Sequence, residues 1–298
     1  MNSTKEKLCI SFSGGRTSAV MTKLCVEQYS GTHDIVITFA NTGCEHENTL
    51  KFVDQCDKHF GWGVVWLEAV VQPNKGDGIR HKIVNFNTAS RKGEPFEAYV
   101  AKYGLPGPTH PQCTSRLKEE VMDSYRHREL GWKRGTYLTA IGIRSDEADR
   151  MSEKRIEKKF VYPLVQAGWT KEDVKQECKR WPFDLDIKGE HYGNCVLCWK
   201  KSLRKLLTLA QEDESVFDFP KYLEEKYQNV RERDGERGGV FNIFRKDMST
   251  KDIIQMSKEV KFTPYKDSTQ AHLFSFADYN VTLDTGSACG DSCEVGAD

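Results

Sequence analysis

The sequence predicts an α/β fold in which helices cover both faces of a doubly wound, mostly parallel β-sheet. Three short runs of apolar and β-branched residues, Leu8–Phe12, Ile35–Ala40 and Val64–Val70, have the composition of buried strands. Between them lie two segments with helical spacing of apolar residues, Ala19–Val26 and Glu47–Phe60. Strands that alternate with helices in this way form parallel sheets whose ligands bind beyond the carboxyl ends of the strands.

The turn between the first strand and the first helix predicts an anion site. It consists of Ser13, Gly14, Gly15, Arg16, Thr17 and Ser18. Two adjacent glycines let the backbone approach a phosphate without a Cβ in the way, and a helix N-terminus presents N–H groups to it. The hydroxyls add donors, and the arginine adds a fixed positive charge. The alternative is an ordinary glycine-rich turn.

This turn resembles the PP-loop, Ser-Gly-Gly-x-x-Ser, of the superfamily of ATP pyrophosphatases and phosphoadenosine phosphosulfate (PAPS) reductases. Arg16 stands where a lysine is usual, and the stretch matches neither a Walker A motif nor G-x-G-x-x-G. The resemblance implies a Rossmann-like fold. It also implies that the loop holds the phosphates of an adenine nucleotide, whose α-phosphate is the centre of the chemistry.

A second loop follows the second strand and resembles the second nucleotide-contacting motif of the family. It contains the candidate residues Asn41, Thr42, Gly43 and Glu45. Because the carboxyl ends of parallel strands meet at one edge, we expect this loop and the first to face the same cleft. A turn that merely caps the following helix is the alternative.

A fourth strand is expected at Thr136–Ile143, and its end resembles the family motif Gly-Ile-Arg-x-x-Glu-Ser without the final serine. Gly142 and Arg144 therefore join the predicted nucleotide-binding residues. An arginine at the carboxyl end of a strand is suited to clamp a phosphate or sulfate. Asp146 and Glu147 are candidates to hold Mg²⁺ against that phosphate. A charged, exposed loop is the alternative.

Ten cysteines without a secretory signal indicate metal, cluster or redox chemistry together with buried thiols. Cys195 and Cys198 form a Cys-x-x-Cys pair that suits zinc, an iron–sulfur cluster or a dithiol. Cys113 begins a segment that resembles the Cys-Cys-x-x-Arg-Lys element of adenylylsulfate reductases, with Gln112 replacing the first cysteine. The resemblance implies that these three cysteines hold a [4Fe-4S] cluster beside the nucleotide.

The fourth ligand of that cluster is left open by the sequence. An open iron, Cys178, or the tail cysteines Cys289 and Cys293 are the alternatives, and we include Cys293 in the predicted metal set. Cys44, in the second loop, stays unassigned. The cysteines in expected strands and helices are predicted to be buried thiols: Cys9, Cys25 and Cys56.

Two reactions are compatible with the resemblance. In the first, an acceptor oxygen attacks the α-phosphate of ATP, pyrophosphate leaves, and sulfur carried by the cluster or a cysteine then displaces AMP. Arg16, Arg144 and Mg²⁺ would stabilise the transition state as catalytic groups. In the second, a cysteine thiolate attacks the sulfur of a sulfonucleotide (APS or PAPS), and reduction of the S-sulfocysteine releases sulfite.

The tail favours the first reaction. Reductases of this family carry their nucleophile in Glu-Cys-Gly-x-His, and the resemblance would give that catalytic role to Cys289. Here the surrounding residues are Ala288, Gly290 and Asp291, so both the glutamate and the histidine are missing. A third alternative is a nucleotide-binding protein with a structural zinc site made by the two cysteine pairs.

The remaining sequence sets the expected organisation and partners. We expect a PP-loop nucleotide-binding domain at 1–210 and a helical extension with a cysteine-containing tail at 211–298. Within the first, residues 72–111 are rich in glycine and proline and predict a loop-rich insertion with one or two short helices. A helix after Cys198 is expected to carry a cationic patch for phosphates or nucleic acid, or simply a solvated face. That patch comprises Lys200, Lys201, Arg204 and Lys205.

The charge and hydropathy of the sequence argue against some classes of protein. The chain has 298 residues, 44 basic and 44 acidic, so net charge gives no general signal for nucleic-acid binding. Without a long apolar run or signal-like start we expect a cytoplasmic protein with no membrane partner. An adenine nucleotide is the expected ligand. A sulfur donor or a thiol or electron-donor protein, a nucleic-acid acceptor and a homo-oligomer are further expected partners.

Overall fold

A six-stranded sheet forms the centre of the molecule in the computed structural model, which describes residues 5–74, 76–108, 110–193, 195–230 and 241–267. The strand order is β4-β3-β2-β1-β5-β6. The strands are β1 (Glu6–Ser11), β2 (His33–Asn41), β3 (Val65–Val71), β4 (Ile79–Val84), β5 (Leu138–Ala140) and β6 (Phe160–Val161). All neighbouring strands run parallel except β3 and β4. The predicted α/β fold with a mostly parallel sheet is confirmed.

Strand β1 lies in the middle of the sheet because both of its faces are apolar. Its residue Ile10 pairs with Ile37 of β2 on one side and with Ala140 of β5 on the other, and all three are buried. A strand covered by helices on both faces has a continuous apolar sequence of this kind. The chain passes from β3 and β4 at one edge to β5 on the far side of β1. The strand order therefore reverses between β1 and β5, where such folds bind ligands.

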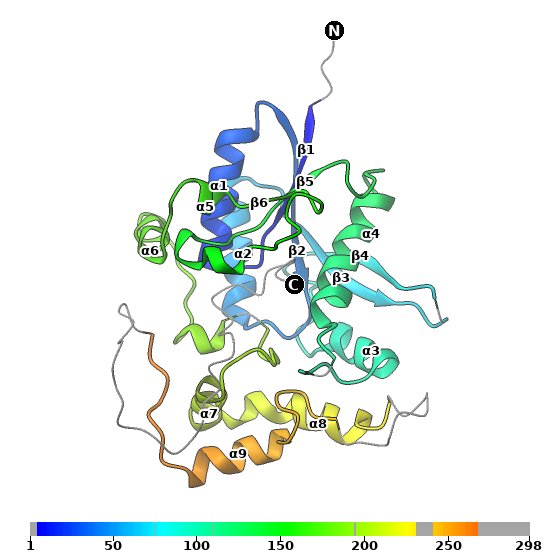
Figure 1. The fold of residues 1–298 in the computed structure, drawn as a ribbon, viewed down its shortest axis with the longest axis vertical. Coiled ribbons are helices and arrows are strands. Elements are labelled where there is room, and N and C mark those ends of the chain that lie inside the picture. Colours follow the sequence, from blue (N-terminus) through cyan, green and yellow to red (C-terminus); the bar gives the residue numbers. More distant parts are fainter. Residues whose placement is uncertain (1–4, 75, 109, 194, 231–240, 268–298) are drawn as a thin grey trace.

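Helices cover both faces of the sheet (Figure 1). They are α1 (Arg16–Tyr29), α2 (Glu47–Phe60), α3 (Glu94–Tyr103), α4 (Glu120–Arg128), α5 (Pro163–Gln166), α6 (Lys171–Cys178), α7 (Leu203–Glu212), α8 (Asp218–Tyr227) and α9 (Thr250–Glu259). One buried cluster joins the sheet to α1, α2 and α6, and a second joins it to α3, α4 and the C-terminal helices. Helix α6 begins with the capping box that its sequence suggests, formed by Thr170 and Asp173.

The stretch 72–111 contains α3 but also a strand, β4, that the sequence did not predict. This strand pairs antiparallel with β3 at the edge of the sheet. Arg80 and Lys82 of this strand are charged and exposed, as is common on edge strands, whereas the His81 side chain between them is only 7% exposed. The charged residues that protect this sheet edge therefore interrupt the apolar pattern by which a strand is recognised in the sequence. A helical segment follows Gln112, and its part Ser115–Glu119, just before α4, is a π-helix.

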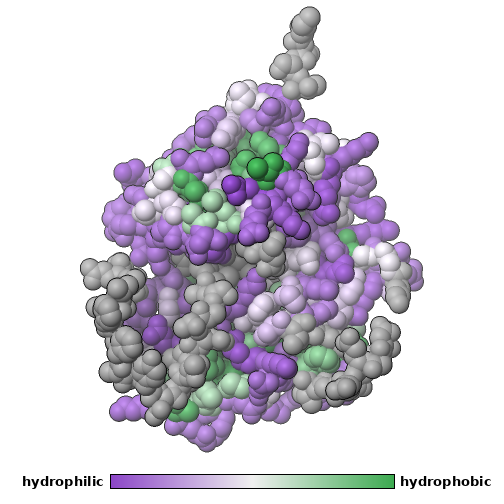
Figure 2. Space-filling model, in the orientation of Figure 1, coloured by the Kyte–Doolittle hydropathy of each residue, from purple (hydrophilic) through white to green (hydrophobic). Residues whose placement is uncertain are grey.

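The C-terminal helices share a buried cluster with residues of the sheet. Residue 210 lies inside α7, and Leu206 of that helix shares a buried cluster with Leu67 of β3 and Ile253 of α9. The face in Figure 2 is mostly hydrophilic, with small separate apolar areas. Among the helices that the structure describes, none has the length and apolar character needed to cross a membrane.

Candidate functional site

The Ser-Gly-Gly turn leads directly from β1 into α1, and its own hydroxyls fix its shape. Ser18 Oγ accepts from the backbone N–H of Ser13 at 3.2 Å and lies 2.9 Å from the Ser13 hydroxyl. The Ser18 hydroxyl in turn donates to the carbonyl of Gly15 at 3.0 Å. Among the described residues, no side chain caps the N-terminus of α1. The first N–H groups of this 14-residue helix are therefore available to an anion.

Gly14 is required at its position for two independent reasons. Its φ of +84° lies in the left-handed region that favours glycine. A Cβ at this position would also lie 2.7 Å from Thr49 Cγ2 and 3.1 Å from Val53 Cγ2 of helix α2. The turn therefore sits directly against α2, and this contact fixes the height of the loop above the sheet.

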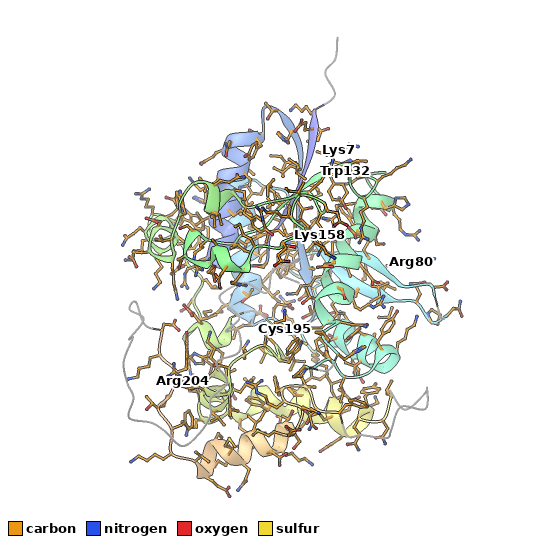
Figure 3. All side chains as sticks on the ribbon, viewed as in Figure 1. Lys7, Arg80, Trp132, Lys158, Cys195 and Arg204 are labelled. Atoms are coloured by element: carbon orange, nitrogen blue, oxygen red, sulfur yellow. The ribbon has the colours of Figure 1, made fainter. Side chains whose placement is uncertain are left out.

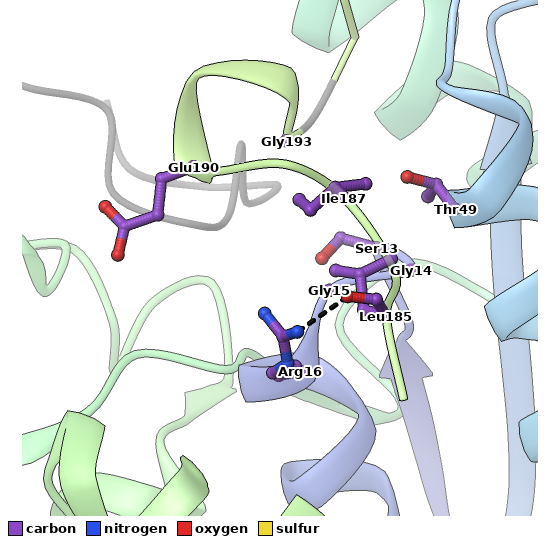
Figure 4. Close-up of a pocket in the computed structure, with 9 residues that line it drawn as sticks. All are labelled: Ser13, Gly14, Gly15, Arg16, Thr49, Leu185, Ile187, Glu190 and Gly193. Atoms are coloured by element: carbon purple, nitrogen blue, oxygen red, sulfur yellow. Dashed lines mark hydrogen bonds between the residues drawn. The ribbon is translucent and has the colours of Figure 1, made fainter. Parts of the chain in front are cut away.

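A pocket lies over this turn, and its far wall comes from a segment that the sequence did not single out (Figure 4). The turn contributes four residues and α2 contributes Thr49. The opposite wall consists of Leu185, Ile187, Glu190 and Gly193. No motif marks this segment in the sequence, and only its position just before Cys195 hints at it. Tertiary folding alone brings it over the loop.

Arg16 is held by the same wall. Its guanidinium donates to both carboxylate oxygens of Asp184, at 2.7 and 2.9 Å, and to the carbonyl of Leu185 at 2.6 Å. Both charged side chains remain partly exposed. Arg16 is thus at the mouth of the pocket, where a phosphate oxygen would compete with Asp184 for the same donors.

Arg144 connects the loop after β5 to the first turn of α1. Its Nη1 donates to the hydroxyl of Thr17 at 3.0 Å, and its Nε donates to Asp146 at 3.0 Å. Glu147 completes the ion cluster, 3.3 Å from Nη2. The arginine side chain is only 6% exposed, so its charge lies beneath the helix N-terminus. Both predicted arginines therefore lie at the start of α1, Arg16 as part of it and Arg144 through its bond to Thr17.

The two carboxylates predicted to hold Mg²⁺ accept hydrogen bonds from arginine side chains. Asp146 accepts from Arg144, and Glu147 Oε1 also accepts from Arg150 at 2.6 Å. The second oxygen of Glu147 is buried and has no hydrogen-bond partner among the described residues. Gly142 lies in the buried turn between β5 and Arg144.

The second loop is folded by its own polar groups. The Asn41 amide donates to Glu68 Oε1 at 2.7 Å and to the Ser90 carbonyl at 2.9 Å. Both oxygens of Glu45 are used, by the Thr42 hydroxyl and by the backbone N–H of Thr42. Gly43 has a φ of +78° and packs against Gly93. Burial raises the pKa of Glu45 above its usual value. These residues therefore shape the loop, and none of them lines the pocket.

Cys44 and Cys195 lie together, a pairing that the sequence did not predict. Their thiols form a hydrogen bond, which lowers the pKa of Cys195, whereas burial raises the pKa of Cys44. The backbones also meet, because Val196 N–H donates to the Cys44 carbonyl at 2.9 Å. Figure 3 shows Cys195 between the sheet and the C-terminal helices.

Of the predicted metal ligands, Cys113, Cys195 and Cys198 lie among the described residues. Cys113 is partly exposed and packs on the second buried cluster, and Cys198 is buried one turn after Cys195. Within the described ranges, no three Cys, His, Asp or Glu side chains converge where a metal would sit. Cys178 lies in α6 among the residues that cover the other face, and burial raises its pKa to about 12. Cys289 and Cys293 lie outside the described residues.

The cysteines predicted to be buried thiols are buried: Cys9 in β1, Cys25 in α1 and Cys56 in α2. The expected cationic patch is much smaller than the sequence suggested. Lys201 is buried, and its ammonium donates to the carbonyls of Gly193 and Cys195 at 2.9 and 3.0 Å. Lys205 is also buried, near Glu190. Two of the four cationic side chains are therefore buried and contact neighbouring parts of the chain, so they do not contribute to a surface patch.

The sheet order, the Ser-Gly-Gly turn at the head of α1 and Arg144 from the neighbouring strand define a Rossmann-like α/β protein of the PP-loop class. The sequence model of the phosphoadenosine phosphosulfate reductase domain matches residues 7–178, more than half of the chain. The chain therefore belongs to the PAPS reductase family, which implies adenine nucleotide binding and suggests a nucleotide-utilising enzyme.

Two relatives have no assigned activity. The chain is 33% identical over 291 residues to the uncharacterized nin region protein ORF290 of Escherichia phage lambda, covering 96% of this chain and 94% of that protein. It is 26% identical over 235 residues to the uncharacterized protein MJ0066 of Methanocaldococcus jannaschii. That match covers 76% of this chain and 42% of the archaeal protein.

Proposed function

We propose that this protein binds ATP at the Ser-Gly-Gly turn and activates an acceptor by attack on the α-phosphate, as the first half of a sulfur transfer. The observation that supports this most is the intact loop itself. Gly14 brings the loop backbone against α2, Ser18 fixes the shape of the loop, and no described side chain caps the N-terminus of α1. These features suit a polyphosphate better than a single neutral group.

The proposed reaction consists of two displacement steps. An acceptor oxygen attacks the α-phosphorus of ATP, the bond to the bridging oxygen breaks, and pyrophosphate leaves. A sulfide-class donor then attacks the acceptor carbon, and AMP leaves with the oxygen. Arg16 would exchange Asp184 for a phosphate oxygen, and Arg144 would keep positive charge beneath the first turn of α1.

No step of this proposal depends on an iron–sulfur cluster. The [4Fe-4S] cluster stays a prediction of the family resemblance. Iron and acid-labile sulfide analysis of protein purified without oxygen tests it, and about four irons per chain would support it.

The function is tested first by binding and then by products. Arg16→Gln should weaken ATP binding in titration calorimetry. The control Arg180→Gln changes an exposed arginine that follows α6 and does not line the pocket, and it should leave binding unchanged. With ATP, Mg²⁺, sulfide and bulk tRNA, the protein should release AMP and pyrophosphate and produce a thiolated product. Release of ADP and phosphate would contradict the proposal. Sulfite release from PAPS, with ATP unused, would instead identify a sulfonucleotide reductase.

A further inference from the structure

The far wall of the nucleotide pocket is mostly a loop. All of residues 179–189 are described, and none of them lies in a helix or strand. A short 3₁₀-helix, Glu190–Tyr192, follows them. A loop is positioned by its contacts with other parts of the chain, because it has no ladder of backbone hydrogen bonds of its own. These contacts therefore decide where the wall lies over the Ser-Gly-Gly turn.

The first end of the wall is held by helices of the matched family domain. Asp184 accepts from Arg16 of α1 at 2.7 and 2.9 Å, and the Asp186 carbonyl accepts from the Asn48 side chain of α2. The second end of the wall is at Glu190 (Figure 4). The family match ends at residue 178, so the wall itself lies beyond it.

The second end of the wall is held by residues 261–267, which follow α9 and which we call the C-terminal strap. The Tyr265 hydroxyl donates to Glu190 Oε2 at 2.8 Å. The Glu190 backbone N–H donates to both carboxylate oxygens of Asp267, at 3.0 and 3.2 Å. Lys171, at the start of α6, also donates to the Glu190 carboxylate. The strap thus contacts both the side chain and the backbone of one residue of the wall.

Tyr265 is itself fixed to α7. Its backbone N–H donates to the Thr208 hydroxyl at 2.8 Å. The cationic groups of Arg204 and Lys205 lie 5.6 and 4.6 Å from the centre of its ring, within the range of cation–π attraction. The His191 ring packs edge-on against the same ring, with the two centroids 5.7 Å apart. Tyr265 therefore connects α7 to the short helix of the wall.

We propose that Tyr265 and Asp267 are positioning residues of the nucleotide pocket, which fix Glu190 and with it the wall opposite the Ser-Gly-Gly turn. The effect on ATP binding rests on the proposed function, whereas the effect on the wall does not. Part of the C-terminal extension then contributes to nucleotide binding. Such coupling is reciprocal, so a nucleotide in the pocket stabilises the strap as much as the strap favours nucleotide binding.

The test compares two tyrosine variants of the full-length chain, each of which removes one hydroxyl bonded to a glutamate. Tyr265→Phe removes the bond to Glu190, and the matched control Tyr227→Phe removes a bond of the same length, 2.8 Å, to Glu97. Neither Tyr227 nor Glu97 is among the described residues that line the pocket. Amide hydrogen exchange followed by mass spectrometry, without nucleotide, reports on the wall. Titration calorimetry measures ATP binding.

Tyr265→Phe should accelerate exchange in the wall peptide 182–193. It should also weaken ATP binding about three- to tenfold, the contribution of one hydrogen bond of ordinary strength. Asp267→Ala should accelerate exchange in the wall as well, because it removes the acceptor of the Glu190 N–H. Tyr227→Phe should leave both measurements at wild-type values. In the wild type, saturating ATP should slow exchange in the strap as well as in the wall.

Three results would overturn the proposal. The first is unchanged exchange of the wall in Tyr265→Phe, and the second is an equal loss of ATP affinity in both tyrosine variants. The third is ATP binding by the wild type without slower exchange in the strap, a measurement that does not depend on the folding of a variant. A wild type that fails to bind ATP would refute the proposed function alone, because exchange without nucleotide still tests whether the strap holds the wall.

Discussion

Replacing Gly14 by alanine tests whether backbone geometry and close packing both fix the loop. An alanine in the left-handed region costs roughly 1 to 2 kcal/mol. The added Cβ would meet Thr49 Cγ2 at 2.7 Å, a distance that forces a shift of the loop or of α2. Overpacking of this kind costs about 1 to 3 kcal/mol more. We therefore expect Gly14→Ala to lower the free energy of unfolding by about 2 to 5 kcal/mol and to weaken ATP binding.

Two comparisons separate these contributions in urea unfolding followed by circular dichroism. Gly61, at the end of α2, has a φ of +65° and open space around its missing Cβ, so Gly61→Ala reports the backbone cost alone. Thr49→Ser removes the obstructing methyl, and in the Gly14→Ala background it should restore about 1 to 3 kcal/mol. Equal losses for both alanine variants, or no recovery with Thr49→Ser, would refute the packing argument.

The remaining predictions concern charged groups around the pocket. Asp184→Asn should release Arg16 and tighten ATP binding by up to about fivefold, since a partly exposed ion pair contributes about 1 kcal/mol at most; calorimetry showing weaker binding would contradict this. Arg144→Gln removes one of the two arginines paired with the buried Glu147. Because Arg150 remains, the variant should lose less than the roughly 3 to 5 kcal/mol that a fully unpaired buried charge costs in urea unfolding, and a variant as stable as the wild type would count against the cluster. Burial works to raise the pKa of Glu190, but hydrogen bonds from Lys171 and Tyr265 outweigh it and hold that pKa below its usual value. Ionised Glu190 therefore stabilises the folded protein at pH values above about 4.5, its pKa in the unfolded chain. This stabilisation is lost as the pH falls through the lower pKa that Glu190 has in the folded protein. Glu190→Gln should flatten the acid side of the stability–pH curve, and an unchanged slope there would show that Glu190 does not contribute.

Much of the fold followed from local pattern. The strands and helices around the loop lie close to where their apolar spacing predicted them, and α2 has the expected bounds. The edge strand β4 was missed because its exposed polar residues conceal its pairing with β3. The cationic patch was overestimated because sequence cannot show that Lys201 turns inward to two carbonyls.

The sequence by itself determined the class of protein, because an apolar strand, two glycines and a helix start are local features that specify a phosphate-binding turn. Tertiary structure alone decided which side chains surround that turn. Asp184 meets Arg16, and Cys44 meets Cys195, across separations of more than a hundred residues. Such contacts depend on how the loops at the sheet edge pack, which no short-range spacing encodes. The motif therefore identifies the family, whereas the side chains available for chemistry at the site depend on tertiary packing.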